Sequence, residues 1–376
     1  MKNIVILGST GSIGQATLDI ISLLPGKFSV FGLAANRQRD LLLKQIKKFE
    51  PVFASFNDKS ESRPENIGKT RCLYGDDGLE FLATRPEVDI VVMAISGLAG
   101  LVPTLKALEA GKIVALATKE IIVCAGHLLF GKKGKILPVD SEHNAIFQML
   151  EKENRKEINK IILTASGGPF LSYKGNLRDV TVEQVLNHPI WKMGRRITVD
   201  SATMMNKGLE IIEAFYLFNI KKEDIKVVLH PQAIVHGFIL FIDGFMKAIL
   251  SMPDMRYSIN YCLSYPERIC AGLPEPDISG MHALTFEEIE KGRFPCFELA
   301  KQSLKMGGSY LTVLNAADDE SVNLFLDGHI RFDSIPLLIE KALDRHKPVS
   351  LNCADDVLQL DKNIRAQVRS FVEEII

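Results

Sequence analysis

The sequence predicts an α/β protein with an N-terminal Rossmann-like parallel sheet, a central α+β domain and a C-terminal helical bundle. Up to about residue 147, short β-branched runs alternate with helical stretches, the pattern of a parallel sheet with crossover helices. A new strand pattern starts near residue 158, and from residue 297 the periodicity is helical throughout. The expected divisions are therefore 1–147, 148–272, a linker at 273–296, and 297–376.

The N-terminal part contains apolar β-branched runs separated by amphipathic stretches. The strands expected from these runs are 4–7, 28–33, 90–95, 113–116 and 136–139, and the helices are 13–24, 40–49 and 101–110. Cys124 and His127 lack a second ligand pair, so a packed loop is expected around them.

The middle part begins with a strand at 158–164 and a loop-rich region, followed by a helix at 207–218. Two alternating runs at 227–236 and 238–250 predict antiparallel strands that carry His230 and His236 as structural residues, with a hairpin at Asp243-Gly244. An exposed edge of this sheet would suit a dimer. The tail helices are expected at 297–306, 311–326, 335–343 and 354–376, and the acidic run 318–320 is expected as a solvated face.

Composition excludes several classes of protein. The 376 residues carry a net charge of −1, which gives no reason to expect nucleic-acid or membrane-surface binding. The six cysteines form no Cys-x-x-Cys pair and indicate a reduced, cytoplasmic chain. No apolar run is long enough for a signal-peptide core or a membrane span, so a soluble intracellular protein is expected.

A glycine-rich turn marks a dinucleotide site. Gly8-Ser-Thr-Gly-Ser-Ile-Gly14 follows a strand and opens a helix, where backbone N–H groups can bind a pyrophosphate. Asn36-Arg37-Gln38 occupies the place where an NAD enzyme carries Asp or Glu, and Arg37 favours NADPH through its 2′-phosphate. The alternative is a tight strand–helix turn without a ligand. The expected cofactor contacts in these segments are Thr10, Gly11, Ser12, Ile13, Asn36, Arg37 and Gln38.

Carboxylates predict a metal site. Asp140 and Glu142 alternate along a segment expected to be extended, so both side chains can point the same way, and Glu210 adds a further oxygen ligand. Such an all-oxygen set favours Mg²⁺ or Mn²⁺ over zinc. The alternative for Asp140-Ser-Glu-His is a helix N-cap followed by an acidic first turn.

Polar groups near Glu210 predict a grip for an anionic, phosphorylated substrate. Asn206 and Lys207 share a helix face with Glu210, and Ser201 precedes them. Ser166-Gly-Gly-Pro169 follows a strand and can present N–H groups and a hydroxyl, although a plain turn is the alternative. Residues 188–194 contain Trp191, the only tryptophan, in a segment that suits a lid; a core tryptophan is the alternative.

With these segments described, nearly the whole chain resembles the 1-deoxy-D-xylulose 5-phosphate reductoisomerase family. The most specific match is the string Asp-Ser-Ala-Thr-Met-Met-Asn-Lys-Gly-Leu-Glu at 200–210. Further matching motifs lie at 8–14, 139–144, 166–170, 188–194, 230–232, 253–255 and 325–328.

The resemblance implies an NADPH domain, a central catalytic and dimerisation domain, and a helical bundle. It implies metal ligands Asp140, Glu142 and Glu210, and catalytic residues Lys119, Glu142 and His188. Substrate contacts would come from Lys119, Ser141, Glu142, Ser166, His188, Trp191, Ser201, Asn206, Lys207 and Glu210, and further cofactor contacts from Thr118, Glu120 and Gly194. The chain departs from the usual family pattern at Asn36, Gln38, Leu98 and Thr118, which bears on cofactor affinity before activity.

The implied reaction is NADPH- and divalent-metal-dependent rearrangement and reduction of 1-deoxy-D-xylulose 5-phosphate to 2-C-methyl-D-erythritol 4-phosphate, in isoprenoid precursor synthesis. One alternative is an NADPH-dependent dehydrogenase of the homoserine or semialdehyde type, which would not need a carboxylate triad. The other is a non-catalytic NADPH sensor, which would tolerate changes at Lys207 and His188.

Overall fold

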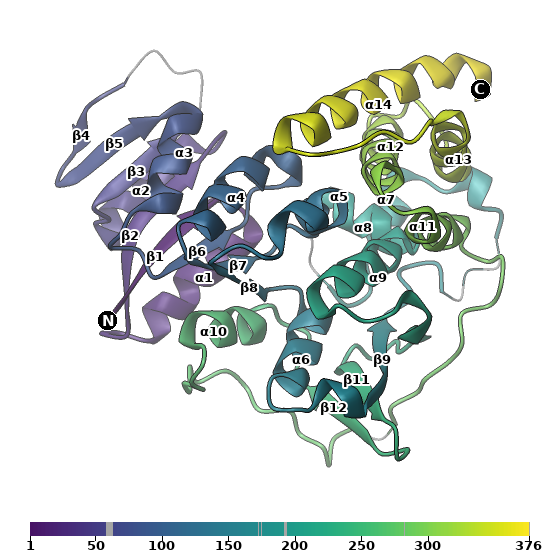
Figure 1. Cartoon of the computed structure of the whole chain (residues 1–376), viewed down its shortest axis with the longest axis horizontal. Coiled ribbons are helices and arrows are strands. Elements are labelled where there is room, and N and C mark those ends of the chain that lie inside the picture. Colours follow the sequence, from purple (N-terminus) through teal and green to yellow (C-terminus); the bar gives the residue numbers. More distant parts are fainter. Residues whose placement is uncertain (58–62, 172, 174, 192–193, 282, 376) are drawn as a thin grey trace. The chain divides into compact units, whose positions relative to one another are not determined.

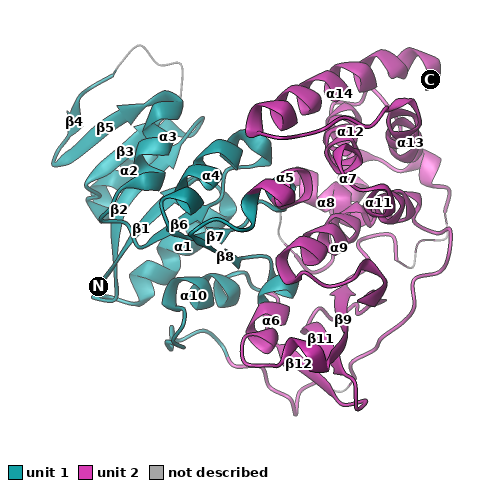
Figure 2. Ribbon diagram, viewed as in Figure 1, with its two compact units in different colours: residues 1–121, 129–144, 254–274 teal, residues 122–128, 145–253, 275–376 magenta. Residues whose placement is uncertain are grey.

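The computed structural model describes residues 1–57, 63–171, 173, 175–191, 194–281 and 283–375. By internal contacts the chain divides into two compact units (Figure 2). Unit 1 comprises residues 1–121, 129–144 and 254–274, and unit 2 comprises 122–128, 145–253 and 275–376. None of the helices in the described ranges is long and apolar enough to cross a membrane.

Unit 1 is built on an eight-stranded sheet in the order β4-β5-β3-β2-β1-β6-β7-β8 (Figure 1). All neighbouring pairs are parallel except β4 and β5. In the central strand β1, Ile4, Val5, Ile6 and Leu7 are fully buried, as expected for a parallel strand covered on both faces. The strands are β1 Lys2–Leu7, β2 Phe28–Ala35, β3 Phe53–Phe56, β4 Asn66–Ile67, β5 Thr70–Tyr74, β6 Ile90–Met93, β7 Ile113–Leu116 and β8 Lys135–Pro138.

The helices of unit 1 pack in pairs, α1 with α10 and α3 with α4. They are α1 Ser12–Leu23, α2 Arg39–Phe49, α3 Gly75–Thr84, α4 Leu101–Glu109 and α10 Arg256–Ser264. α5 Lys119–Leu129 and α6 Ser141–Leu150 each begin in unit 1 and continue into unit 2. The predicted parallel sheet is confirmed, but β3, β4, β5, α3, α5 and α10 were not predicted from the sequence.

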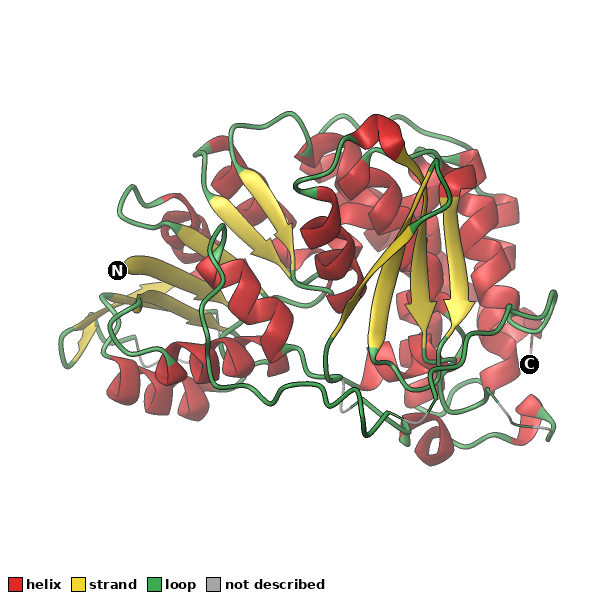
Figure 3. Cartoon of the chain, turned by 90° about the horizontal axis from the view of Figure 1, so that it is seen from below, coloured by secondary structure: helices red, strands yellow, loops and turns green. Residues whose placement is uncertain are grey.

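Unit 2 contains a four-stranded sheet in the order β10-β9-β11-β12, seen in yellow in Figure 3. The strands are β9 Ile158–Ala165, β10 Ile225–Leu229, β11 Val235–Phe241 and β12 Met246–Leu250. β11 and β12 are antiparallel and are joined at Asp243-Gly244, which confirms the predicted hairpin. Gly244 adopts φ 92°, a conformation that glycine accepts without steric cost.

The first alternating run was wrongly predicted as one antiparallel strand. β10 ends at Leu229, pairs in parallel with β9, and is followed by a turn in which Ala233 has φ 50°. The His230 ring nitrogen Nε2 accepts the backbone N–H groups of Ile234 and Val235, at 3.2 and 3.1 Å. His230 is therefore structural, as predicted, but it organises a turn. His236 lies in β11 and contacts Ser251 Oγ through Nε2 at 2.8 Å.

The helices predicted in unit 2 at 207–218 and after residue 297 are present with slightly different bounds, whereas α7 and α8 were not predicted. Its helices are α7 Val182–Leu186, α8 Arg195–Ala202, α9 Met205–Phe218, α11 Pro295–Met306, α12 Ser309–Leu326, α13 Ile335–Arg345 and α14 Ala354–Ile375. The last predicted residue of the tail helix, 376, lies outside the described residues. α11 and α9 pack closely, because a Cβ on Gly208 would lie 2.4 Å from the Ala300 Cβ. α12 packs against both α13 and α14.

Two predictions about polar segments were wrong. Cys124 and His127 lie in helix α5 rather than in a loop, and His127 Nε2 lies 2.7 Å from the Leu351 carbonyl oxygen. The acidic run 318–320 lies inside α12, where Asp318 is fully buried. The local sequence shows the charged residues at 318–320, but it does not show the distant partners that allow a charged side chain to be buried.

The contact-based division also differs from the predicted boundaries. Residues 254–274 cluster with unit 1, where the Lys2 ammonium donates to the carbonyl oxygens of Leu263, Ser264 and Tyr265. The helices after residue 297 cluster with 145–253 in unit 2. The division into nucleotide, catalytic and tail domains remains a prediction about function.

Candidate functional site

The turn between β1 and α1 in unit 1 has the geometry of an anion site. Gly8 has φ 95°, and a Cβ on Gly14 would lie 2.4 Å from the Gly8 carbonyl oxygen, so both positions require glycine. Gly11 is the N-cap of α1 and supplies no side-chain hydrogen bond to the helix. The first N–H groups of α1, which begins at Ser12-Ile13, therefore have no side-chain cap to compete with an anionic ligand. Thr10 is buried just before the N-cap.

Most of the other predicted cofactor residues follow the carboxyl ends of β2 and β7 in the sheet of unit 1. Asn36, Arg37 and Gln38 are exposed directly after β2, so the Arg37 guanidinium is available to solvent or to a phosphate. Thr118 is the N-cap of α5, and its hydroxyl donates to the Ile95 carbonyl at 2.6 Å. The remaining predicted contacts are Glu120 in the first turn of α5 and Gly194 at the N-cap of α8 in unit 2. Leu98, where the chain departs from the family pattern, lies in the short η1 helix Gly97–Gly100.

The Asp140–Glu142 segment is not extended, and this prediction was wrong. Helix α6 starts at Ser141, and the Asp140 carbonyl accepts the Asn144 N–H at 2.8 Å, as in the alternative N-cap arrangement. Glu142 lies in the first turn, where its carboxylate accepts the Ser141 hydroxyl at 2.7 Å. A helix forms here because the apolar positions from Ala145 to Leu150 continue at helical spacing into a buried face.

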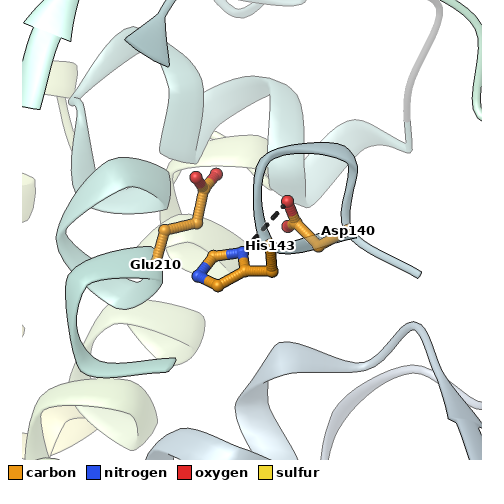
Figure 4. A group of neighbouring side chains, drawn as sticks. All are labelled: Asp140, His143 and Glu210. Carbon is orange, nitrogen blue, oxygen red and sulfur yellow. Dashed lines mark ion pairs between the residues drawn. The ribbon is translucent and has the colours of Figure 1, made fainter. Parts of the chain in front are cut away.

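Asp140 lies between two cationic or ionisable side chains of unit 1. The Lys119 ammonium is 2.6 Å from one carboxylate oxygen, and His143 Nδ1 is 3.3 Å from the other. Figure 4 draws the pair of Asp140 and His143, together with the side chain of Glu210 from unit 2. Lys119 and His143 are both buried, so the charge of Asp140 is balanced in a poorly hydrated place.

The predicted metal ligand Glu210 lies in unit 2, with two polar side chains of its own helix beside it. Its carboxylate is 1% exposed, accepts the Asn206 amide at 2.6 Å and pairs with the Lys207 ammonium. Helical spacing explains the arrangement, because residues three and four positions apart lie on one face. The predicted shared face of Asn206, Lys207 and Glu210 is confirmed.

His188 joins two segments that are distant in sequence. Its Nε2 lies 3.1 Å from Ser201 Oγ and 3.4 Å from Ser166 Oγ. Its Nδ1 accepts the backbone N–H groups of Ile190 and Trp191, at 3.2 and 2.9 Å. Because burial lowers the pKa of His188, the imidazole is neutral, and the occupied Nδ1 assigns its proton to Nε2. The ring therefore offers an N–H donor beside two hydroxyl groups.

The structure thus brings together three predicted substrate residues without a ligand. Trp191 follows His188 in the same turn and is half-buried, so it is not the fully buried core tryptophan of the alternative. Residues 192 and 193 of the predicted lid lie outside the described residues. The loop after β9 is held close to α8, because a Cβ on Gly168 would lie 2.5 Å from the Ser201 carbonyl oxygen.

Comparisons with known proteins cover nearly the whole chain. Models of the 1-deoxy-D-xylulose 5-phosphate reductoisomerase match residues 4–126, those of its C-terminal domain match 136–218, and the DXP reductoisomerase C-terminal domain matches 250–367. A 1-deoxy-D-xylulose 5-phosphate reductoisomerase of Caldanaerobacter subterraneus is 45% identical over 98% of both chains. One of Trichlorobacter lovleyi is 47% identical over 98% of this chain and 97% of the relative. The chain belongs to the 1-deoxy-D-xylulose 5-phosphate reductoisomerase family.

Solved structures of reductoisomerases agree with this. A crystal structure of DOX-P reductoisomerase in complex with NADPH, fosmidomycin and magnesium is 35% identical, covers 99% of this chain and 98% of its own, and has a TM-score of 0.91. The Zymomonas mobilis reductoisomerase in complex with NADPH is 38% identical, covers 99% of both chains, and also has a TM-score of 0.91. The fold is therefore that of the reductoisomerases.

The sequence analysis of this reductoisomerase missed two side chains near the site. His143 was part of a quoted motif, and its spacing of three from Asp140 at the start of a helix was the available signal. Arg196 lies one turn before Asp200 on α8 and contacts acidic residues more than a hundred positions away. No local signal could have identified those partners.

Proposed function

We infer that this chain catalyses the NADPH- and divalent-metal-dependent rearrangement and reduction of 1-deoxy-D-xylulose 5-phosphate to 2-C-methyl-D-erythritol 4-phosphate, in isoprenoid precursor synthesis. The observation that carries this conclusion is membership of the reductoisomerase family over the full chain. The charges and hydrogen-bonding groups of the site residues support it, and the roles of these residues form the rest of the proposal.

The substrate phosphate binds at the cluster of Ser166, His188 and Ser201. The neutral His188 donates from Nε2, and each hydroxyl can rotate its proton toward a phosphate oxygen. Asn206 and Lys207 complete the grip from α9, where the Lys207 ammonium exchanges part of its contact with Glu210 for the phosphate. Binding energy from this remote group is available to close the segment around Trp191 over the substrate.

The metal ligands are Asp140, Glu142 and Glu210. Carboxylate oxygens suit Mg²⁺ or Mn²⁺, and the ammonium groups beside Asp140 and Glu210 show that both places already balance negative charge with a cation. When bound there, a divalent cation supplies Lewis acidity and a template for the substrate's carbonyl and hydroxyl oxygens. The residues present fit such an ion, and His143 orients Asp140.

The reaction breaks one carbon–carbon bond and forms a different one to give a branched aldehyde, which takes up a hydride and a proton. Lys119, released from Asp140, stabilises the developing oxyanion and Ser141 contacts the reacting end of the substrate. NADPH supplies the hydride. It binds along the β1–α1 turn through residues 10–13, with Asn36, Arg37 and Gln38 around the 2′-phosphate and Thr118, Glu120 and Gly194 contributing further contacts.

The enzyme is further proposed to act as a homodimer in the cytoplasm. The β11–β12 hairpin and the edge strand β12 carry exposed apolar side chains, with Phe245 75%, Ile242 67% and Met246 51% exposed. An edge strand with such a surface is suited to cover by a second copy. Light scattering of the purified protein measures the mass directly, and Phe245→Glu should shift a dimer toward monomer; a monomeric wild type contradicts this.

The activity is tested by following NADPH absorbance with 1-deoxy-D-xylulose 5-phosphate, with Mg²⁺ or Mn²⁺ and again with excess EDTA. Oxidation that requires the metal and yields a branched polyol phosphate is the expected result. Activity that persists in EDTA favours a dehydrogenase of the homoserine or semialdehyde type. No turnover in either arm, with NADPH still bound, favours a sensor.

A further inference from the structure

A buried ionic cluster lies next to the proposed phosphate site and is used by none of the roles above. Arg196 on α8 lies 2.9 Å from Asp319 and 3.6 Å from Asp318, both on α12, and its Nη2 donates to Asn315 Oδ1 at 3.2 Å. Asp318 is fully buried. The Arg196 guanidinium offsets part of the cost of burying the Asp318 carboxyl group, so α8 and α12 are joined through Arg196.

The same cluster extends to the last helix of unit 2. Arg365 on α14 pairs with Asp319, the residue that also contacts Arg196, and with Asp361 at 2.7 Å. Arg369 pairs with Glu320 one residue further along α12. Asp319 is therefore shared between α8 and α14, so the C-terminal bundle fixes where the Arg196 guanidinium can lie.

Helix α8 connects Arg196 to Ser201, one of the residues proposed to bind the substrate phosphate. Arg196 also lies 3.6 Å from Asp200, four positions along α8, and Ser201 is the next residue. The Ser201 hydroxyl lies 3.1 Å from His188 Nε2, and its carbonyl is packed against Gly168 with no room for a Cβ. A shift of α8 by a fraction of an ångström changes the distance between Ser201 and His188 directly.

We propose that Arg196 is a positioning residue for the phosphate subsite: held by Asp318 and Asp319, it fixes α8 and places the Ser201 hydroxyl opposite His188. This inference rests on the proposed phosphate role of the His188 cluster. In a variant without the Arg196 guanidinium, the buried carboxylates on α8 and α12 lose the cation between them. The helices must then separate, or the carboxylates must take up protons. The charged groups that contact Arg196 are Asp200, Asp318 and Asp319. Arg365 pairs with the same Asp319, and the Cys296 thiol interacts with Asp318 and Asp200.

The test measures binding of inorganic phosphate by the fluorescence of Trp191, the only tryptophan, whose backbone N–H donates to His188 Nδ1. Arg196→Met should raise the phosphate dissociation constant about tenfold. Arg195→Met changes an exposed side chain on the same helix and should leave the constant within about twofold. Arg369→Met removes the pair with Glu320 on α12 but leaves both ion pairs of Asp319 in place, so phosphate binding should be retained.

The outcomes separate the two levels of the proposal. A wild type without a saturable phosphate response overturns the phosphate role of the cluster, and this inference with it. A wild type that binds, with Arg196→Met binding equally well, overturns only the positioning role, as does an equal loss of binding in Arg369→Met. If Arg196→Met does not fold, Arg196→Lys decides, because it keeps the charge and loses the planar fork: unchanged binding overturns the inference, and weaker binding supports it.

Discussion

Replacing His188 by asparagine and by glutamine tests separately the two roles of its ring, as an acceptor at Nδ1 and as a donor at Nε2. Asparagine can place its side-chain oxygen near the former Nδ1, where it still accepts the N–H groups of Ile190 and Trp191. It has no group at the position of Nε2, so the donor toward Ser166 and Ser201 is lost. Glutamine can place an N–H near Nε2 but cannot also accept at Nδ1.

The magnitude follows from the type of hydrogen bond. A donor to a charged phosphate contributes about 1.5–3 kcal/mol, which is about ten- to 150-fold in affinity. His188→Asn should therefore raise KM for the phosphorylated substrate by about that factor. His188→Gln should keep more of the substrate affinity but alter the fluorescence of Trp191 in the free protein, because the turn that holds its N–H is lost.

The assay is steady-state NADPH oxidation with varied substrate, combined with Trp191 fluorescence of the free variants. His329→Asn changes an exposed histidine in the tail and serves as the matched control, with kinetics expected to be unchanged. Equal kinetics of His188→Asn and wild type would refute the assignment of a donor at Nε2. A His188→Asn variant with a disturbed tryptophan signal and His188→Gln without one would show that the two ring nitrogens were assigned the wrong way round.

Other changes test the remaining parts of the site. Glu210→Gln should abolish turnover while NADPH binding, measured by its fluorescence, stays largely intact; normal turnover contradicts the metal assignment. Arg37→Ala should raise KM for NADPH by about tenfold with little effect on NADH, since one charge-assisted contact is lost, and equal changes for both cofactors contradict the 2′-phosphate role. Burial raises the pKa of Asp318 to about 7, although Arg196 acts in the opposite direction. The folded state therefore holds this proton more tightly than the unfolded chain does. As a result, the stability that this group gives the wild type falls as the pH rises from about 4 to 7. Asp318→Asn cannot lose a proton at this position. The melting temperature of the variant minus that of the wild type should therefore increase between pH 5 and pH 8, and a difference that stays constant contradicts a titration of buried Asp318.

The local parts of the fold could be read from the sequence. Residues 113–116 were predicted as the strand that the structure has as β7, and 335–343 as the core of α13. The hairpin at Asp243-Gly244 needed only its two turn residues and the alternation on either side. Short segments of the site were equally legible, because Gly8, Gly14 and the face of Asn206, Lys207 and Glu210 depend on neighbours within a few positions.

The sequence by itself thus determined many of the strands and helices and the short motifs that carry charge and hydroxyl groups, because these depend on periodicity and backbone sterics over a few residues. Only the tertiary structure decided that His188 joins Ser166 to Ser201, and that Asp318 is buried against Arg196. Asp318 looked like part of a solvated face because a buried charge is stable only with its partner, and that partner lies more than a hundred residues away on another helix. Long-range pairing of this kind leaves no periodic trace in a single sequence.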